Sequence, residues 1–158
     1  MRWPRRKPEL VYPIPPAPRT AVLAAGFRSR GLARVFAEGW GERAREFQLQ
    51  AVAGSIEQID RVDVEISHAI VVLGRVQDAR VSEADRERWW RRFGVPVFEQ
   101  IIGERGELLA AECEAHDGLH LVDEAGRSLG GELDESPCGC GRKSPRLKFE
   151  EKKIAAGR

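Results

Sequence analysis

The sequence predicts an α/β protein with a small mixed sheet, and three observations support that fold class. Two apolar segments rich in β-branched residues, 62–73 and 95–102, flank an amphipathic segment, 82–94, which is the pattern of a parallel βαβ unit. Before this unit, apolar residues recur at helical intervals and predict N-terminal helices. After it, all three cysteines and two of the three histidines fall within residues 112–142, where a hairpin would bring them together.

The composition limits the possible classes of protein. A length of 158 residues allows one domain with its own core. Charged residues make up 32% and hydrophobic residues 42%, as in ordinary globular proteins. Because no apolar run is long enough to cross a bilayer and the N-terminus lacks the apolar segment of a secretory signal, we expect a cytoplasmic protein without membrane association.

Basic residues gather at both ends of the chain, although the formal net charge is only +1. Residues 1–20 hold six of the nine prolines and predict a disordered arm rich in proline and arginine, with Trp3 and Tyr12 as candidate anchors. Its P-x-x-P spacings also fit a polyproline ligand of an aromatic groove. Residues 149–158 predict a basic tail. We expect both ends to be solvated rather than to bind nucleic acid.

The single α/β domain is expected to span residues 21–148. Residues 21–53 carry apolar side chains at roughly helical intervals, broken by four glycines, and predict two or three short helices. Ser55, followed by Glu57 and Gln58, indicates the start of another short helix that ends near Arg61.

The βαβ unit begins with the alternation of Val62, Val64 and Ile66, which continues into an apolar run and predicts a strand with a buried far end. His68 shares the parity of these apolar residues, so we expect it to face the core as a hydrogen-bonded residue without a site role.

Ser82 and Asp85 resemble a helix N-cap, and Gly94 fits a C-terminal cap. Between them, Trp89, Trp90 and Phe93 form an apolar stripe. Aromatic residues at helical spacing are usually core residues, so we interpret the stripe as packing rather than as a nucleic-acid or membrane surface.

The segment after Gly103 predicts two further strands and the cysteine and histidine cluster. An odd number of cysteines excludes complete internal pairing, so we interpret the thiols as reduced. Three thiolates and one imidazole suit a structural zinc ion, and the predicted ligands are Cys113, His116, Cys138 and Cys140. His120 is the alternative to His116, and Asp117 is a candidate acceptor for the histidine ring.

Four motifs occur in the order V-V-L-G (71–74), F-G-V-P-V-F-E (93–99), A-E-C-E-A-H-D-G-L-H (111–120) and C-G-C-G-R (138–142). Together, residues 64–147 resemble the phenylacetate-CoA ligase group of the adenylate-forming (acyl-CoA synthetase) superfamily. Some members of that group look like zinc binders through this kind of cysteine and histidine set. The resemblance implies the same four ligands within a zinc-clasp region, residues 112–142.

The departures from the family pattern concern the catalytic parts. The chain has no Ser/Thr/Gly-rich phosphate loop, and residues 101–107 offer neither an aromatic ring for adenine nor a hydroxyl for phosphate. Glu104 and Glu107 both remain open as counterparts of the family's magnesium-binding glutamate. Only seventeen residues separate His120 from Cys138, where the family has a long segment that holds the ribose. We therefore expect no catalytic residues and no binding of ATP or CoA.

The expected function is that of a shortened, non-catalytic, zinc-stabilised adenylate-forming-like domain with a binding or accessory role. The alternative is a subunit of a split acyl-CoA ligase, which would bind a nucleotide or acyl group and activate a carboxylic acid together with a partner chain. A protein partner is expected in either case, with a ligase or an acyl-carrier protein as candidates.

Overall fold

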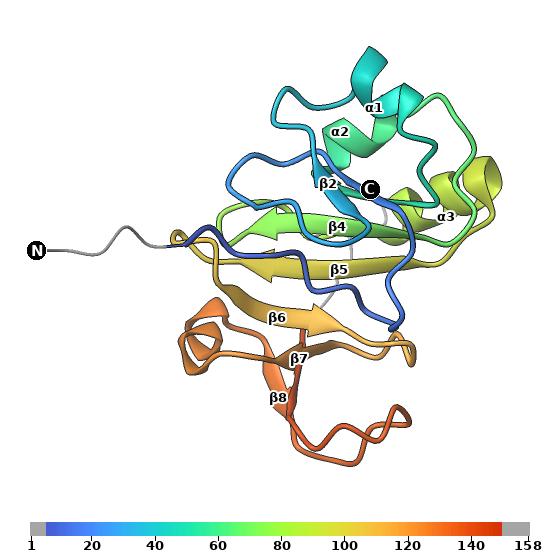
Figure 1. The fold of residues 1–158 in the computed structure, drawn as a ribbon. Coiled ribbons are helices and arrows are strands. Elements are labelled where there is room, and N and C mark those ends of the chain that lie inside the picture. The colour runs from blue at the N-terminus through green and yellow to red at the C-terminus, as the bar shows by residue number, and fades with distance from the viewer. Residues whose placement is uncertain (1–5, 150–158) are drawn as a thin grey trace, which may run out of the picture.

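Short apolar segments form a single mixed sheet in the computed structural model, which describes residues 6–149 (Figure 1). The strands lie in the order β2-β1-β3-β4-β5-β6-β7-β9-β8. Their bounds are β1 Thr20–Val22, β2 Ala33–Val35, β3 Ala51–Gly54, β4 Ala69–Arg75, β5 Val97–Ile102, β6 Leu108–Glu112, β7 Leu119–Leu121, β8 Glu132–Asp134 and β9 Arg146–Lys148. The helices are α1 Glu42–Glu46, α2 Ile56–Asp60, α3 Glu83–Phe93 and the 3-10 helix η1 Glu124–Leu129. The predicted α/β class with a mixed sheet is confirmed.

Strands β2, β1, β3, β4 and β5 are parallel to one another. Helix α3 joins β4 to β5, so the predicted βαβ unit is confirmed. Strands β6, β7, β9 and β8 continue the sheet in antiparallel pairs. The direct pairing of β7 with β9 places the connection between β8 and β9, which holds Cys138 and Cys140, beside β7.

The sheet has two faces with different coverings. On one face, which we call the α3 face, Ile70, Val72 and Val97 pack with Trp89 of α3 in the largest core cluster. On the other, which we call the arm face, Val22, Val71 and Leu73 form a second core. Because neighbouring residues of a strand point to opposite faces, β4 contributes side chains to both cores. Its sequence is therefore a nearly continuous run of apolar residues.

The N-terminal arm lies against the arm face, where it crosses the strands (Figure 1). Leu10 and Tyr12 pack on the second core, and Gln100 Nε2 donates a hydrogen bond of 2.7 Å to the Val11 carbonyl. This corrects the expectation of a disordered arm for residues 6–20, because the apolar side chains of the arm cover a sheet face on which no described helix packs. Residues 1–5, including Trp3, and residues 150–158 of the predicted basic tail lie outside the described residues.

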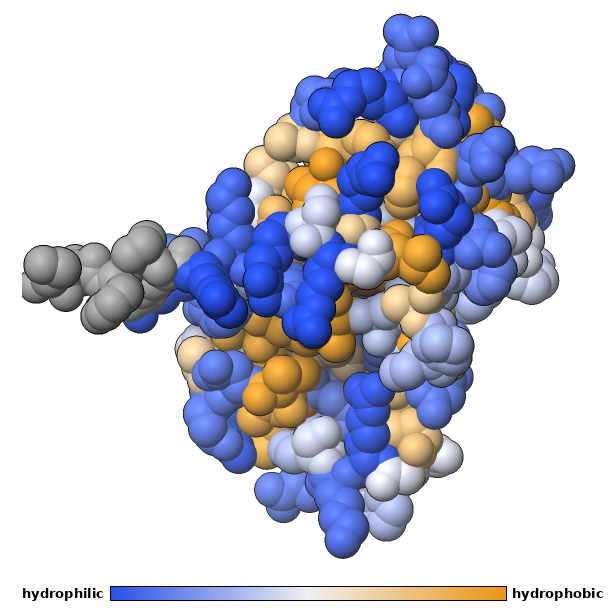
Figure 2. Space-filling model, in the orientation of Figure 1, coloured by the Kyte–Doolittle hydropathy of each residue, from blue (hydrophilic) through white to orange (hydrophobic). Residues whose placement is uncertain are grey.

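The prediction of helices over residues 21–53 is wrong for most of that segment, which contains three strands and only the short α1. Every residue of β1 and β3 is buried. A buried parallel strand needs apolar residues on both faces, and runs of three or four such residues also fit a helical spacing. Helix α1 consists mostly of charged residues, and Ala44 is its one buried residue. Figure 2 accordingly shows hydrophilic residues at the top of the view, where α1 lies in Figure 1.

Two helix starts agree with the local sequence signals. Ser55 caps α2 with Gln58 in a capping box, and Ser82 caps α3 with Asp85 in the same way. Helix α3 ends at Gly94, whose φ of 66° is the left-handed conformation that glycine adopts without strain. None of the described helices has the length and apolar character needed to cross a membrane.

The strand predicted over residues 62–73 begins later than expected, because only β4 is a strand. Val62 and Ile66 are buried in the core beneath the helices instead of pairing with a neighbouring strand. The preceding loop leaves His68 exposed, with its Nδ1 2.8 Å from Ser67 Oγ. This corrects the expectation that His68 faces the core.

Adjacent tryptophans on α3 offer a direct test of the packing. Trp89 is fully buried and donates from Nε1 to Asp60 at 2.8 Å, whereas Trp90 is 61% exposed. Trp89→Ala should lower the free energy of unfolding by about 3–5 kcal/mol, because it leaves a cavity and removes one of the hydrogen bonds to Asp60, which keeps its ion pair with Arg88. Trp90→Ala should change it by less than about 0.5 kcal/mol. Urea unfolding of both variants measures the difference, and equal losses would contradict this packing.

Candidate metal centre

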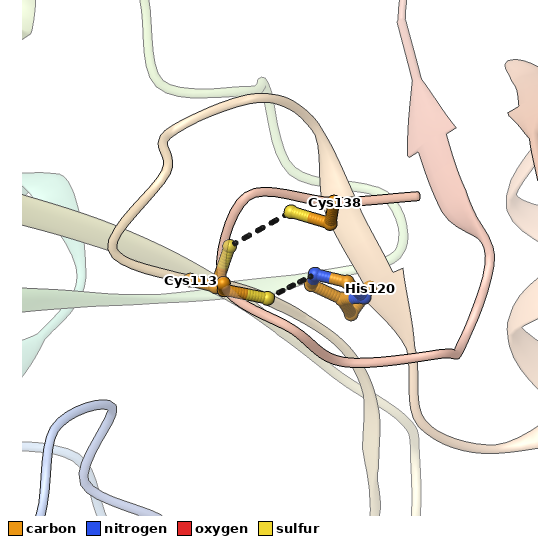
Figure 3. Close-up of side chains that lie close together, drawn as sticks. Cys113, His120 and Cys138 are labelled. Atoms are coloured by element: carbon orange, nitrogen blue, oxygen red, sulfur yellow. Dashed lines mark hydrogen bonds between the residues drawn. The ribbon is translucent and has the colours of Figure 1, made fainter. Parts of the chain in front are cut away.

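Four side chains from separate parts of the C-terminal half converge on the arm face, as Figure 3 shows for Cys113, His120 and Cys138. With Cys140 they form a Cys₃His group in which the sulfur and nitrogen atoms all lie within 4.8 Å of one another. The Sγ atoms of Cys113 and Cys138 are 3.6 Å apart, and Cys140 Sγ is 3.3 Å from His120 Nε2. This group could hold a metal ion.

Strand alternation explains why these residues meet. In the pairing of β6 with β7, Ala111 lies opposite His120, so both side chains point to the arm face. Cys113, two residues beyond Ala111, keeps that direction. Leu119 and Leu121 point to the α3 face and enter a third core cluster there.

The hydrogen bonds of His120 orient its ring for metal binding. Its Nδ1 lies 3.0 Å from the carbonyl oxygen of Ser144, and because a carbonyl can only accept, Nδ1 carries the proton. In the neutral ring the lone pair is therefore on Nε2, which faces Cys140. A metal-binding histidine usually donates its other ring N–H to such an acceptor.

Main-chain amides help to set the charge of the thiols. The N–H of Arg142 lies 3.4 Å from Cys140 Sγ, and the N–H of Cys140 lowers the pKa of the Cys138 thiol to about 6. Burial has the opposite effect on Cys113 and raises the pKa of its thiol to about 11. These hydrogen bonds favour the thiolate form of Cys138, whereas burial disfavours the thiolate of Cys113 unless a cation compensates its charge.

The group is shielded from solvent on most sides. Cys113 and His120 are 0% and 1% exposed, Cys138 is buried and only Cys140 is partly exposed. A metal ion with these four ligands would have a complete tetrahedral shell and no position open to a substrate.

The structure places His120, rather than the predicted His116, in the group. His116 follows a tight turn in which its N–H donates to the Cys113 carbonyl at 3.0 Å. Its ring lies 4.9 Å from the ring of Phe98, and its Nδ1 is 3.1 Å from a Glu112 carboxylate oxygen. The two-residue spacing from Cys113 to His116 therefore forms the turn and does not bring the ring to the sulfurs.

Asp117, expected as an acceptor for the histidine ring, has a different role. It forms ion pairs with Arg146 at 2.5 Å and with Lys148 at 3.1 Å, and so ties the loop between β6 and β7 to β9. Ser144 is the acceptor instead. The sequence contained no signal for Ser144, because its contact with His120 depends on how β7 and β9 pair.

Residues 103–107 form a turn between β5 and β6. Glu107 is bound within it, since its Oε2 accepts a hydrogen bond of 2.9 Å from the main-chain N–H of Arg105. Glu104 is exposed. Neither carboxylate belongs to the Cys₃His group.

Comparisons of the chain with protein-family models, with curated proteins and with solved structures gave no match.

Proposed function

We propose that this protein is a non-catalytic, adenylate-forming-like domain in which a structural zinc ion fastens the C-terminal strands, and that it has a binding or accessory role. The observation that carries the proposal is the convergence of three sulfurs and one imidazole nitrogen within 4.8 Å. Cys113, His120, Cys138 and Cys140 are the ligands.

The spacing of the donor atoms suits tetrahedral zinc. With Zn–S near 2.3 Å and Zn–N near 2.0–2.1 Å, ligand atoms lie about 3.8 Å apart for two sulfurs and about 3.6 Å apart for sulfur and nitrogen. The distances of 3.6 Å between Cys113 and Cys138 and 3.3 Å between Cys140 and His120 are close to these values. Thiolate donors with one imidazole favour zinc over magnesium and calcium, which prefer oxygen.

The position of the site supports a structural role. Strands β7, β8 and β9 have three residues each, and the core cluster that they enter is much smaller than the one beneath α3, with Leu119, Leu121 and Leu147 among its buried members. A zinc ion would join the end of β6, the middle of β7 and the loop before β9. Its binding free energy would then contribute directly to the folding of these strands.

The order of the four sequence motifs supports the adenylate-forming-like assignment, and the missing phosphate loop of the sequence supports a non-catalytic role. The alternative, a subunit of a split acyl-CoA ligase that works with a ligase or acyl-carrier partner, requires a nucleotide or acyl group to bind.

Zinc content and two histidine variants test the metal site. The protein purified without chelator should contain about one zinc ion per chain, and less than about 0.2 in a folded sample would contradict the proposal. His120→Ala should weaken zinc binding more than about 100-fold, because losing a ligand costs more than losing an outer hydrogen bond. His116→Ala is the matched control and should keep both stoichiometry and affinity. Elemental analysis and competition with a chromophoric chelator give both quantities.

Calorimetric titration separates the non-catalytic domain from the split ligase. We expect no saturable heat with Mg-ATP or with CoA, because the chain lacks the loop whose main-chain N–H groups would hold phosphates. Saturable binding of either compound by the zinc-loaded protein would favour the split ligase.

A further inference from the structure

A groove of about 870 Å³ lies on the α3 face, on the opposite side of the sheet from the Cys₃His group. Residues of α3, β5, β6, β7 and β9 line it. Its volume is in the range of pockets that hold small molecules, about 300–1,000 Å³.

The groove has an apolar floor and an aromatic wall. Val97, Leu119 and Leu147 form part of the floor, and each is at most 5% exposed. Trp90 stands at the wall with 61% of its surface exposed, while Phe149 lines the groove near Arg80. An aromatic or aliphatic group in the groove would cover the Trp90 indole and gain apolar contact.

Glu99 is a buried acidic residue of the groove with hydrogen-bonding capacity left over. Its side chain is buried, at 5% exposure, and its Oε2 accepts a hydrogen bond of 3.0 Å from the Val81 N–H. Its Oε1 has no hydrogen-bond partner among residues 6–149. Glu112, the other buried carboxylate, is fully engaged by Arg86, the Glu99 N–H and His116.

The charges around the groove favour a cation. Its lining contains four glutamates and two arginines: Glu83, Glu87, Glu99, Glu112, Arg80 and Arg86. Arg86 is bound to Glu112 and to the Val97 carbonyl, and Arg80 donates to the carbonyls of Arg75 and Asp78. Arg80 Nη1 is buried without a hydrogen-bond partner in the described part of the chain. Burial raises the pKa of Glu99 even though the guanidinium groups of Arg80 and Arg86 lower it, so a further positive group beside Glu99 would favour the ionised form.

We propose that this groove binds a small primary amine carried on an apolar body, with the ammonium group donating to Glu99 and the apolar part lying between Trp90 and Leu147. The site is separate from the metal centre, and the proposal does not depend on zinc.

Phenethylamine is a suitable probe, and its affinity can be measured by NMR titration of the full chain. The indole N–H signal of Trp90 should shift to saturation, while that of Trp40, which donates to Asp63 elsewhere, should stay in place. Glu99→Gln keeps an acceptor for the Val81 N–H but removes the charge. It should weaken binding at least about tenfold, the loss expected for one charge-assisted hydrogen bond.

Glu87→Gln is the matched control, because Glu87 is exposed at the groove and forms an ion pair with Arg91 at 2.6 Å. The affinity of this variant for phenethylamine should change less than about threefold. Phenylacetate, which has a similar ring and the opposite charge, should bind at least about tenfold more weakly than the amine. If Glu99→Gln does not fold, Trp90→Ala should fold and lose affinity for the amine. No saturable shift, equal affinity for phenylacetate, or an unchanged affinity in Glu99→Gln or Trp90→Ala would overturn the proposal, whatever the zinc content.

Discussion

The pairing of β6 with β7 is the constraint on which both sites depend. Glu112 lies opposite Leu119, and Ala111 lies opposite His120. Because side chains alternate along a strand, Glu112 points to the groove on one face of the sheet, and its neighbour Cys113 points to the Cys₃His group on the other face. A slip of one residue would exchange the two faces, remove His120 from the sulfurs and bring apolar leucines in its place. The metal centre and the groove are therefore two consequences of one register.

The two halves of the sheet are stabilised in different ways. The parallel half buries large side chains such as Trp89 and Phe36 between helices and strands. The antiparallel half has short strands and keeps Arg146 only 3% exposed between Asp117 and Asp134. Only Arg146 of this ion network is buried, and the attraction of its two partly exposed carboxylates mainly offsets the cost of desolvating it, so the network adds little net stability. A metal ion bound by the Cys₃His group would join β6, β7 and the loop before β9 and so cross-link these short strands.

The features that sequence could predict were those with a local physical cause. The helix caps at Ser55 and Ser82 and the strands β5 and β6 follow from short-range sequence patterns. The clustering of the cysteines predicted a metal site. The strands β1 and β3 were missed because three or four buried apolar residues fit a helix equally well. The choice between His116 and His120 needed the register of β6 and β7. The contact of Glu99 with Val81 depends on tertiary packing that no local pattern encodes.

We propose that one tetrahedral metal ion joins the end of β6, the middle of β7 and the loop before β9. X-ray absorption at the zinc edge of the purified protein tests it most directly, because the method reports the number and type of ligand atoms. The structure predicts a shell of three sulfurs near 2.3 Å and one nitrogen near 2.0–2.1 Å. A shell of oxygen and nitrogen atoms, or one with fewer than three sulfurs, would contradict the account.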